Sequence, residues 1–275
     1  MRIEILRQAA VPAALVAALL GGPVSRCMAQ AEVGGAAVTT RVMVRAVARD
    51  AKVIGSGVGG ALIRIVDAES GDLLAEGRQE GGTGDTDLIM GPHARGMTIY
   101  DTEGTAGFLA ELRLSEPTVV NISTLGPLGY PQAIRSATKQ LLLIPGHDID
   151  GDGVILQLYG FIVEILSPEP LAPVSSVVEV TARVRMMCGC TIEPGGLWDA
   201  DDKEVVARLK ADGEVVSEAR LRFAGRISMF EGSVPVPDAA RGTDLELEVI
   251  VSEAGRENFG RHAVPLGAIA GGGGR

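Results

Sequence analysis

The sequence predicts an all-β protein in which two β-sandwich domains follow one another after a signal peptide. Short stretches in which apolar and polar residues alternate recur along the chain, with turn residues between them. A proline-rich stretch, typical of an extended spacer, separates two such regions, and the first residues have the pattern of an export signal. The predicted segments are a signal peptide at 1–31, a sandwich at 34–166, a linker at 167–173, a second sandwich at 174–266 and a flexible tail at 267–275.

Composition limits the core and the kind of partner. Apolar residues make up 46% of the 275 positions and aromatic residues only 3%, so the core must consist mostly of Val, Leu, Ile and Ala. The net charge is −10, and it becomes −12 without residues 1–31, which carry three arginines and one glutamate. An acidic surface poor in aromatic residues disfavours nucleic acid as a partner, because that binding needs basic patches and often stacking rings.

The N-terminal segment predicts export. Arg2 and Arg7 precede an apolar run over 9–20, and Ala29-Gln30-Ala31 has small residues at the two positions where a signal peptide needs them for cleavage. The run is too short for a membrane-spanning helix, which needs about 20 residues. A lipid anchor on Cys27 is the alternative, but the arginine before it disfavours that processing. We therefore expect a periplasmic or secreted protein with no membrane span in the mature chain.

A hairpin pattern at 60–77 carries the first family resemblance. A strand-like run is followed by the turn residues Asp67 to Asp72 and a second apolar run. The segment resembles a recurring hairpin of carboxypeptidase-regulatory-like and transthyretin-like β-sandwiches, with a serine, Ser70, where threonine is usual. The matching residues are Gly60, Ala61, Ile63, Ile65, Asp67, Gly71, Leu74 and Ala75. The resemblance implies a sandwich fold, found mostly in accessory or binding modules.

Gly55, Gly57 and Gly60 fit the spacing G-x-G-x-x-G of dinucleotide-binding loops. That motif requires a helix directly after the glycines, so that the helix N-terminus meets the pyrophosphate. The residues that follow, 61–66, are strand-like. We therefore expect a loop or bulge before a strand, and no cofactor site.

Residues 81–96 are rich in glycine and polar side chains, among them Asp85, Asp87 and His93. This pattern predicts a long exposed loop. Long loops within compact domains are usually either functional or disordered. A ligand site here is one interpretation, although no specific constellation of side chains stands out.

Asp148, Asp150 and Asp152 occupy positions 1, 3 and 5 of a calcium-loop pattern, with glycine at position 6. An EF-hand needs a bidentate glutamate at position 12, where this chain has Tyr159. Strand-like residues flank the segment on both sides, so we expect a hairpin turn. Calcium binding by the three aspartates is the alternative.

The second sandwich is predicted from strand patterns at 203–210, 214–223, 229–236 and 243–252, the first two joined by an Asp-Gly turn. The later part resembles bacterial immunoglobulin-like domains. The residues that carry this resemblance are Phe230, Gly232, Val234, Val236, Pro237, Gly242, Thr243, Leu245, Leu247 and Val249. It implies a second β-sandwich and says nothing of activity.

The most reactive stretch of the mature chain is Met186-Met187-Cys188-Gly189-Cys190. It ends a strand pattern over 178–187 in which the even-numbered residues are apolar, so Met187 is expected on the wet face. Continued in register, both cysteines share the buried face. The single tryptophan, Trp198, follows closely and is expected to pack there, to cover the cysteines or to bind a ligand.

Three chemistries are open to the Cys-Gly-Cys segment. One is a structural disulfide, for which Gly189 must bend the chain, since extended residues two apart lie about 6.6 Å from each other. Another is a Cu(I) site in which Cys188 and Cys190 bind through sulfur, with Met186 or Met187 as thioether ligands. The third is a redox couple.

Catalytic patterns are otherwise absent from the sequence, and the three histidines, His93, His147 and His262, are widely separated. We expect an exported, non-enzymatic binding or structural module of the cell envelope that acts through loops of two sandwiches. Its partner would be an envelope protein or a small ligand. The alternative is a periplasmic copper-binding or thiol-redox protein that uses the Cys-Gly-Cys segment.

Overall fold

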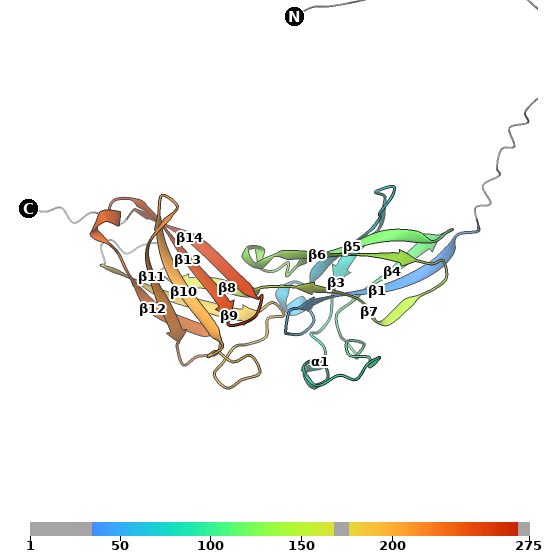
Figure 1. The fold of residues 1–275 in the computed structure, drawn as a ribbon, viewed down its shortest axis with the longest axis horizontal. Coiled ribbons are helices and arrows are strands. Elements are labelled where there is room, and N and C mark those ends of the chain that lie inside the picture. Colours follow the sequence, from blue (N-terminus) through green and yellow to red (C-terminus); the bar gives the residue numbers. More distant parts are fainter. Residues whose placement is uncertain (1–34, 168–175, 269–275) are drawn as a thin grey trace, which may run out of the picture. The chain divides into compact units, whose positions relative to one another are not determined.

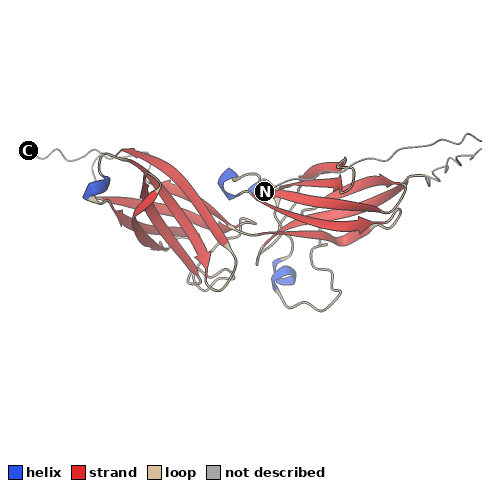
Figure 2. Ribbon diagram, turned by 45° about the horizontal axis from the view of Figure 1, so that its top comes forward, coloured by secondary structure: helices blue, strands red, loops and turns tan. Residues whose placement is uncertain are grey.

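The computed structural model describes residues 35–167 and 176–268, which form fourteen strands, one short α-helix and three 3₁₀ turns. Strands dominate the described chain (Figure 2), and the sheets form a sandwich-like or near-barrel arrangement. The all-β prediction is therefore confirmed. None of the helices in these ranges has the length and apolar character that crossing a membrane requires. The expected signal peptide, Cys27 and residues 168–173 of the linker lie outside the described residues, as do residues 269–275 of the tail.

Two sheets come from the first part of the chain (Figure 1). The order in the three-stranded sheet is β4-β1-β7, and in the four-stranded sheet it is β3-β2-β5-β6. Their strands are β1 (Val38–Ala48), β2 (Ala61–Asp67), β3 (Leu73–Gln79), β4 (Phe108–Leu114), β5 (Thr118–Gly126), β6 (Arg135–Leu143) and β7 (Ile149–Leu158). Alternate residues such as Val42, Val44, Ile63 and Ile65 are fully buried, as period-two patterning predicts.

The later strands form one seven-stranded sheet in the order β14-β13-β10-β11-β12-β9-β8. They are β8 (Phe161–Ser167), β9 (Val177–Met186), β10 (Lys203–Ala211), β11 (Glu214–Phe223), β12 (Met229–Pro235), β13 (Asp244–Glu253) and β14 (Phe259–Ala268). Its two edge strands approach each other, because the backbone N–H of Ile165 in β8 donates to Nδ1 of His262 in β14. The sheet is therefore nearly closed.

The predicted hairpins have mixed outcomes. The strand pair β2–β3 is confirmed, with Asp67 accepting hydrogen bonds from the backbone N–H groups of Glu69 and Ser70 in the turn. The β10–β11 hairpin is also confirmed, with Asp212 at positive φ in its turn. The hairpin expected around 148–153 is wrong, because β6 and β7 lie in different sheets and β7 runs parallel to β1.

Two further differences concern the seven-stranded sheet. Residues 161–166 were expected in the first sandwich, yet β8 pairs with β9 in the later sheet. The chain therefore passes between sheets at Tyr159-Gly160, before the proline-rich stretch. Strand β14 was not foreseen, since Gly260, Pro265 and Gly267 interrupt its apolar pattern. Buried residues of all three sheets form one continuous cluster of mostly Val, Leu, Ile and Ala.

Candidate functional site

The structure joins Cys188 and Cys190 in a disulfide, in a tight turn directly after β9. Gly189 has a φ of +83° and brings the two Cα atoms to 5.4 Å, which confirms the expected bend. Backbone hydrogen bonds close the turn, from Met186 N–H to the carbonyl of Cys190 and from Gly189 N–H to the carbonyl of Met186. In this state the sulfurs bind each other, so thiolate ligation of a metal would require prior reduction.

Both methionines beside the disulfide are fully buried. The prediction that Met187 faces water is wrong, because β9 ends at Met186 and the turn then directs the next side chain inward. Cys188 is 4% exposed and belongs to the same apolar cluster, while Cys190 is half-buried at its margin. The four predicted site residues therefore lie together, in a setting made mainly of packed apolar side chains.

Residues of the first part of the chain cover this turn. A side chain at Gly189 would come within 2.7 Å of Cγ1 of Val58, so that close approach permits only glycine. Trp198 is half-buried, and its indole Nε1 donates a hydrogen bond of 2.9 Å to the carbonyl of Asp50. Asp50 also forms an ion pair with Arg256. Trp198 and the disulfide turn therefore both contact the first part of the chain, at Asp50 and Val58 respectively.

The three aspartates of the calcium-like pattern lie in and before β7 and do not converge. Asp148 accepts from the backbone N–H and from Nε of Arg41, and these hydrogen bonds hold the pKa of its carboxyl below the usual value. Asp150 is exposed. Asp152 turns toward a different loop, at 99–101. Within 35–167 and 176–268, no group of three or more His, Cys, Asp or Glu side chains has a metal-binding arrangement.

A bulge in β7 explains this separation. The register with β1 shifts so that Ile149 faces Val42 while Val154 faces Val44, which leaves extra residues between two neighbouring pairing positions. Gly151 and Gly153, at φ of +60° and +73°, allow the excursion. A side chain at Gly153 would lie 2.4 Å from the carbonyl oxygen of Met43, so this glycine is required for contact with β1.

The bulge is held by a polar cluster that we define as Arg45, Asp101 and Asp152, in which Arg45 is buried, Asp152 is half-buried and Asp101 is exposed. The guanidinium of Arg45, 3% exposed, donates to the carbonyls of Gly151 and Asp152 at 2.5 and 3.0 Å and to Asp101 at 3.1 Å. The carboxylate of Asp152 accepts from the backbone N–H groups of residues 99, 100 and 101, at 2.6 to 3.0 Å. The cluster therefore ties strands β1 and β7 to one loop.

That loop is the β3–β4 loop, residues 80–107, which contains the helix α1 (Thr86–Met90) and extends away from the sheets (Figure 1). Isolated bridges join Glu80 to Gly107 and Gly82 to Thr105 and close its base. Asp85 caps α1 by accepting from the N–H of Leu88. A second apolar cluster lies beneath the loop and consists of Val47, Val53, Ile89 and Ala106, with Met90, Ile99, Tyr100 and Ile155 against it.

The tip of the β3–β4 loop consists of residues 92–98, which are all exposed. Met97 among them exposes 43% of its surface. The ring Nε2 of His93 lies 2.7 Å from the carbonyl of Leu88, which fixes the tip to α1. Arg95 is the only Lys, Arg, Asp or Glu in the tip. The β3–β4 loop thus presents a cationic and partly apolar tip on an ordered base.

Sequence reasoning located this loop but missed its anchor. Arg45 lies between the buried Val44 and Ala46 in β1, so its side chain points to the opposite face of the sheet. The alternation therefore predicts that the Arg45 side chain faces water. The residue is buried because the β3–β4 loop folds over that face of β1. The glycine-rich segment 55–60 is a 3₁₀ turn followed by β2, as expected from its strand-like continuation.

Comparisons with known proteins assign no family. No family model and no curated protein matches the sequence. Among solved structures, the chain is similar to a β-D-glucuronidase of Dictyoglomus thermophilum, with a TM-score of 0.22 and 10% identity over 85% of this chain. The chain spans about a third of that enzyme's length, since the match covers 34% of it. A likeness at this level supports no conclusion on fold or activity, and the two family resemblances stay predictions.

Proposed function

We propose that this chain is an exported, non-enzymatic binding module of the cell envelope that recognises a partner protein through the tip of the β3–β4 loop. The observation that carries the proposal is the anchoring of this 80–107 excursion by the buried Arg45 together with Asp101 and Asp152. A loop that is ordered before binding loses less conformational entropy on association than a disordered one. Binding residues are often located on loops that a rigid scaffold positions.

The chemistry of the tip supports a protein partner. Arginine and methionine are enriched in protein–protein interfaces, and both are exposed here, at Arg95 and Met97. The tip is cationic within a chain of net charge −10, so it favours an acidic partner surface. The Cys188–Cys190 disulfide supports export, because such bonds persist mainly in oxidising compartments.

Crosslinking in the native envelope tests this proposal. A photo-crosslinking amino acid replaces Met97 in the full chain, and the matched control carries it at Val215, which is 47% exposed against 43% for Met97. We expect a discrete adduct from position 97 alone, and its loss in Arg95→Glu. Equal crosslinking from both positions, or a chain that stays in the cytosol with its leader uncut, contradicts the proposal.

A second variant tests the role of the anchor. Lysine cannot reproduce the forked hydrogen bonds of a guanidinium, so Arg45→Lys should loosen the loop and reduce the adduct from position 97. Arg64→Lys is the control, because the ion pair of Arg64 with Glu76 is about half exposed and lies in the four-stranded sheet, to which neither β1 nor β7 belongs. If Arg45→Lys increases exchange of the amides at 99–101 without affecting the adduct, recognition does not depend on the ordered loop.

A further inference from the structure

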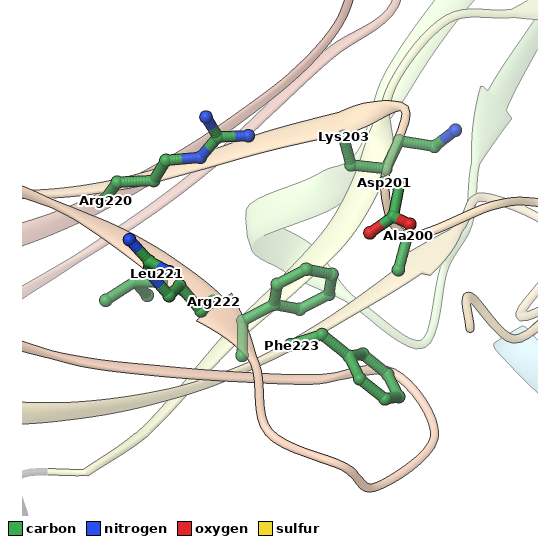
Figure 3. A pocket seen from close by; sticks show the side chains of 8 residues that line it. Ala200, Asp201, Lys203, Arg220, Leu221, Arg222 and Phe223 are labelled. Carbon is green, nitrogen blue, oxygen red and sulfur yellow. The ribbon is translucent and has the colours of Figure 1, made fainter. Parts of the chain in front are cut away.

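A half-open pocket of about 410 Å³ lies at one end of the seven-stranded sheet, beside strands β10 and β11. It exists because β11 pairs with β10 along most of its length but with β12 only at Arg222 and Phe223. Strand β11 is therefore paired over a longer stretch with β10 than with β12. The last residues of β11 form one wall of the pocket. Figure 3 shows Arg220, Arg222 and Phe223 along this wall and Asp201 across from it.

Two guanidinium groups of this pocket have no partner among the residues that the structure describes. Arg220 and Arg222 are exposed, and because they are two residues apart in a strand their side chains lie on one face of the sheet. In the part of the chain that the structure describes, Arg95 is the only other arginine whose side chain has neither a hydrogen bond nor an ion pair. Uncompensated positive charge is thus concentrated here, within an acidic protein.

The neighbouring charges do not neutralise these arginines. Glu231 faces Arg222 across the strand pair, but its carboxylate is bound by Arg226. Lys203, also in the wall, is paired with the buried Glu253 at 2.7 Å. Asp201 is the one acidic residue of the lining, so the pocket keeps a net positive charge.

The aromatic side chains of Phe223 and Phe230 form part of the apolar lining, together with Ala200 and Leu221. Phe223 is half-buried, Phe230 is 2% exposed, and their rings meet edge to face with centroids 6.0 Å apart. Phe223 follows Arg222 directly in β11, so its ring lies on the opposite face of the strand and packs against the apolar core. Guanidinium groups bind carboxylate and phosphate through paired hydrogen bonds, which a single lysine cannot reproduce.

We propose that Arg220 and Arg222 bind the carboxylate or phosphate group of a small anionic ligand that occupies this pocket. The volume lies within the range of about 300 to 1,000 Å³ that is usual for small-molecule sites. The positive charge of the site in a chain of net charge −10 attracts anions selectively. This site is separate from the β3–β4 loop, so the proposal does not depend on the proposed function.

Calorimetric titration of the full chain with benzoate tests the proposal, with benzamide as the neutral analogue of the same shape. We expect saturable binding of benzoate at least about tenfold tighter than that of benzamide, because only the anion pairs with both guanidinium groups. Phenyl phosphate is titrated in parallel, and the tighter of the two anions identifies the preferred oxyanion. The double variant Arg220→Gln/Arg222→Gln should lose this binding.

The matched control is Arg95→Gln, which removes an equally unpartnered arginine in the β3–β4 loop and should bind benzoate like the wild type. Circular dichroism verifies that the double variant is folded, which is expected because neither arginine side chain has a partner to lose. The proposal is overturned if benzamide binds as tightly as benzoate, if neither anion binds, or if the double variant retains the wild-type affinity.

Discussion

The ammonium Nζ of Lys203 lies 2.7 Å from Oε1 of Glu253, and the two side chains are only 1% and 4% exposed. They lie opposite each other on β10 and β13, so the ion pair fixes the register of these strands. Arg256 approaches the same oxygen of Glu253 at 3.7 Å. An ion pair with this little exposure is costly to break on one side only, because the remaining charge is then buried without its partner.

We therefore expect Lys203→Met to lower the free energy of unfolding by about 3 kcal/mol, near the lower end for a broken buried pair because Arg256 compensates in part. The double variant Lys203→Met/Glu253→Leu should recover most of that loss, since it removes both charges. Urea denaturation at neutral pH measures both. A double variant that is less stable than Lys203→Met would contradict this account.

Removing the disulfide should have a modest effect on stability. Cys188 and Cys190 are only two residues apart, and the chain entropy that a crosslink removes from the unfolded state is small for so short a loop, about 1.5 kcal/mol. Cys188→Ala/Cys190→Ala should therefore fold, with unfolding free energy lower by about 2 kcal/mol once lost packing is included. A thiol reductant should destabilise the wild type and leave the variant unchanged.

The contact between β8 and β14 should depend on pH. Burial lowers the pKa of His262 from its ordinary value of 6.5, against an opposing effect of Glu164, and its Nδ1 accepts from Ile165 N–H. The folded state therefore disfavours the protonated ring. The stabilisation is complete above pH 6.5 and is lost as the pH falls through the lower pKa of the folded state.

His262→Gln should remove this dependence, because an amide oxygen can accept the same hydrogen bond without titrating. Between pH 7.5 and 5.5 we expect the wild type to lose more unfolding free energy than the variant, by up to about 1 kcal/mol, the value of one hydrogen bond. Urea denaturation at the two pH values measures the difference. Identical losses in the two proteins would show that His262 does not control this contact.

Local patterning predicted most strands, because a half-buried strand must alternate apolar and polar residues. It could not show which strands share a sheet. Nothing in residues 144–153 indicates that β6 and β7 lie in different sheets, since that depends on the pairing of β7 with β1, about a hundred residues earlier. Strand β14 was missed because its pairing with β13 compensates for a weak apolar pattern.

For the candidate sites too, the sequence reveals what depends on neighbouring residues and does not reveal what depends on long-range contacts. The Cys188–Cys190 turn could be located from sequence because the reactive residues are neighbours in the chain. The Arg45–Asp101–Asp152 cluster and the Arg220–Arg222 pocket could not, since each depends on segments that only the fold brings together. An arginine with a strand-like pattern is normally solvated, and only the covering loop shows that Arg45 is buried.

Substitutions in the glycine-rich segment 55–60 can distinguish a structural role of its glycines from a role in nucleotide binding. A side chain at Gly60 would lie 2.2 Å from the carbonyl oxygen of Gln79, and its φ is +67°, so Gly60→Ala should cost about 3 kcal/mol or more. A side chain at Gly57 would meet no atom within 4 Å in the described part of the chain, its chain neighbours aside, so Gly57→Ala should stay within about 0.5 kcal/mol of the wild type. In a dinucleotide-binding loop the middle glycine is needed for close approach of the pyrophosphate. Thermal denaturation of both variants decides: a severe effect of Gly57→Ala, or none of Gly60→Ala, would show that packing between loop and strand is not what requires these glycines.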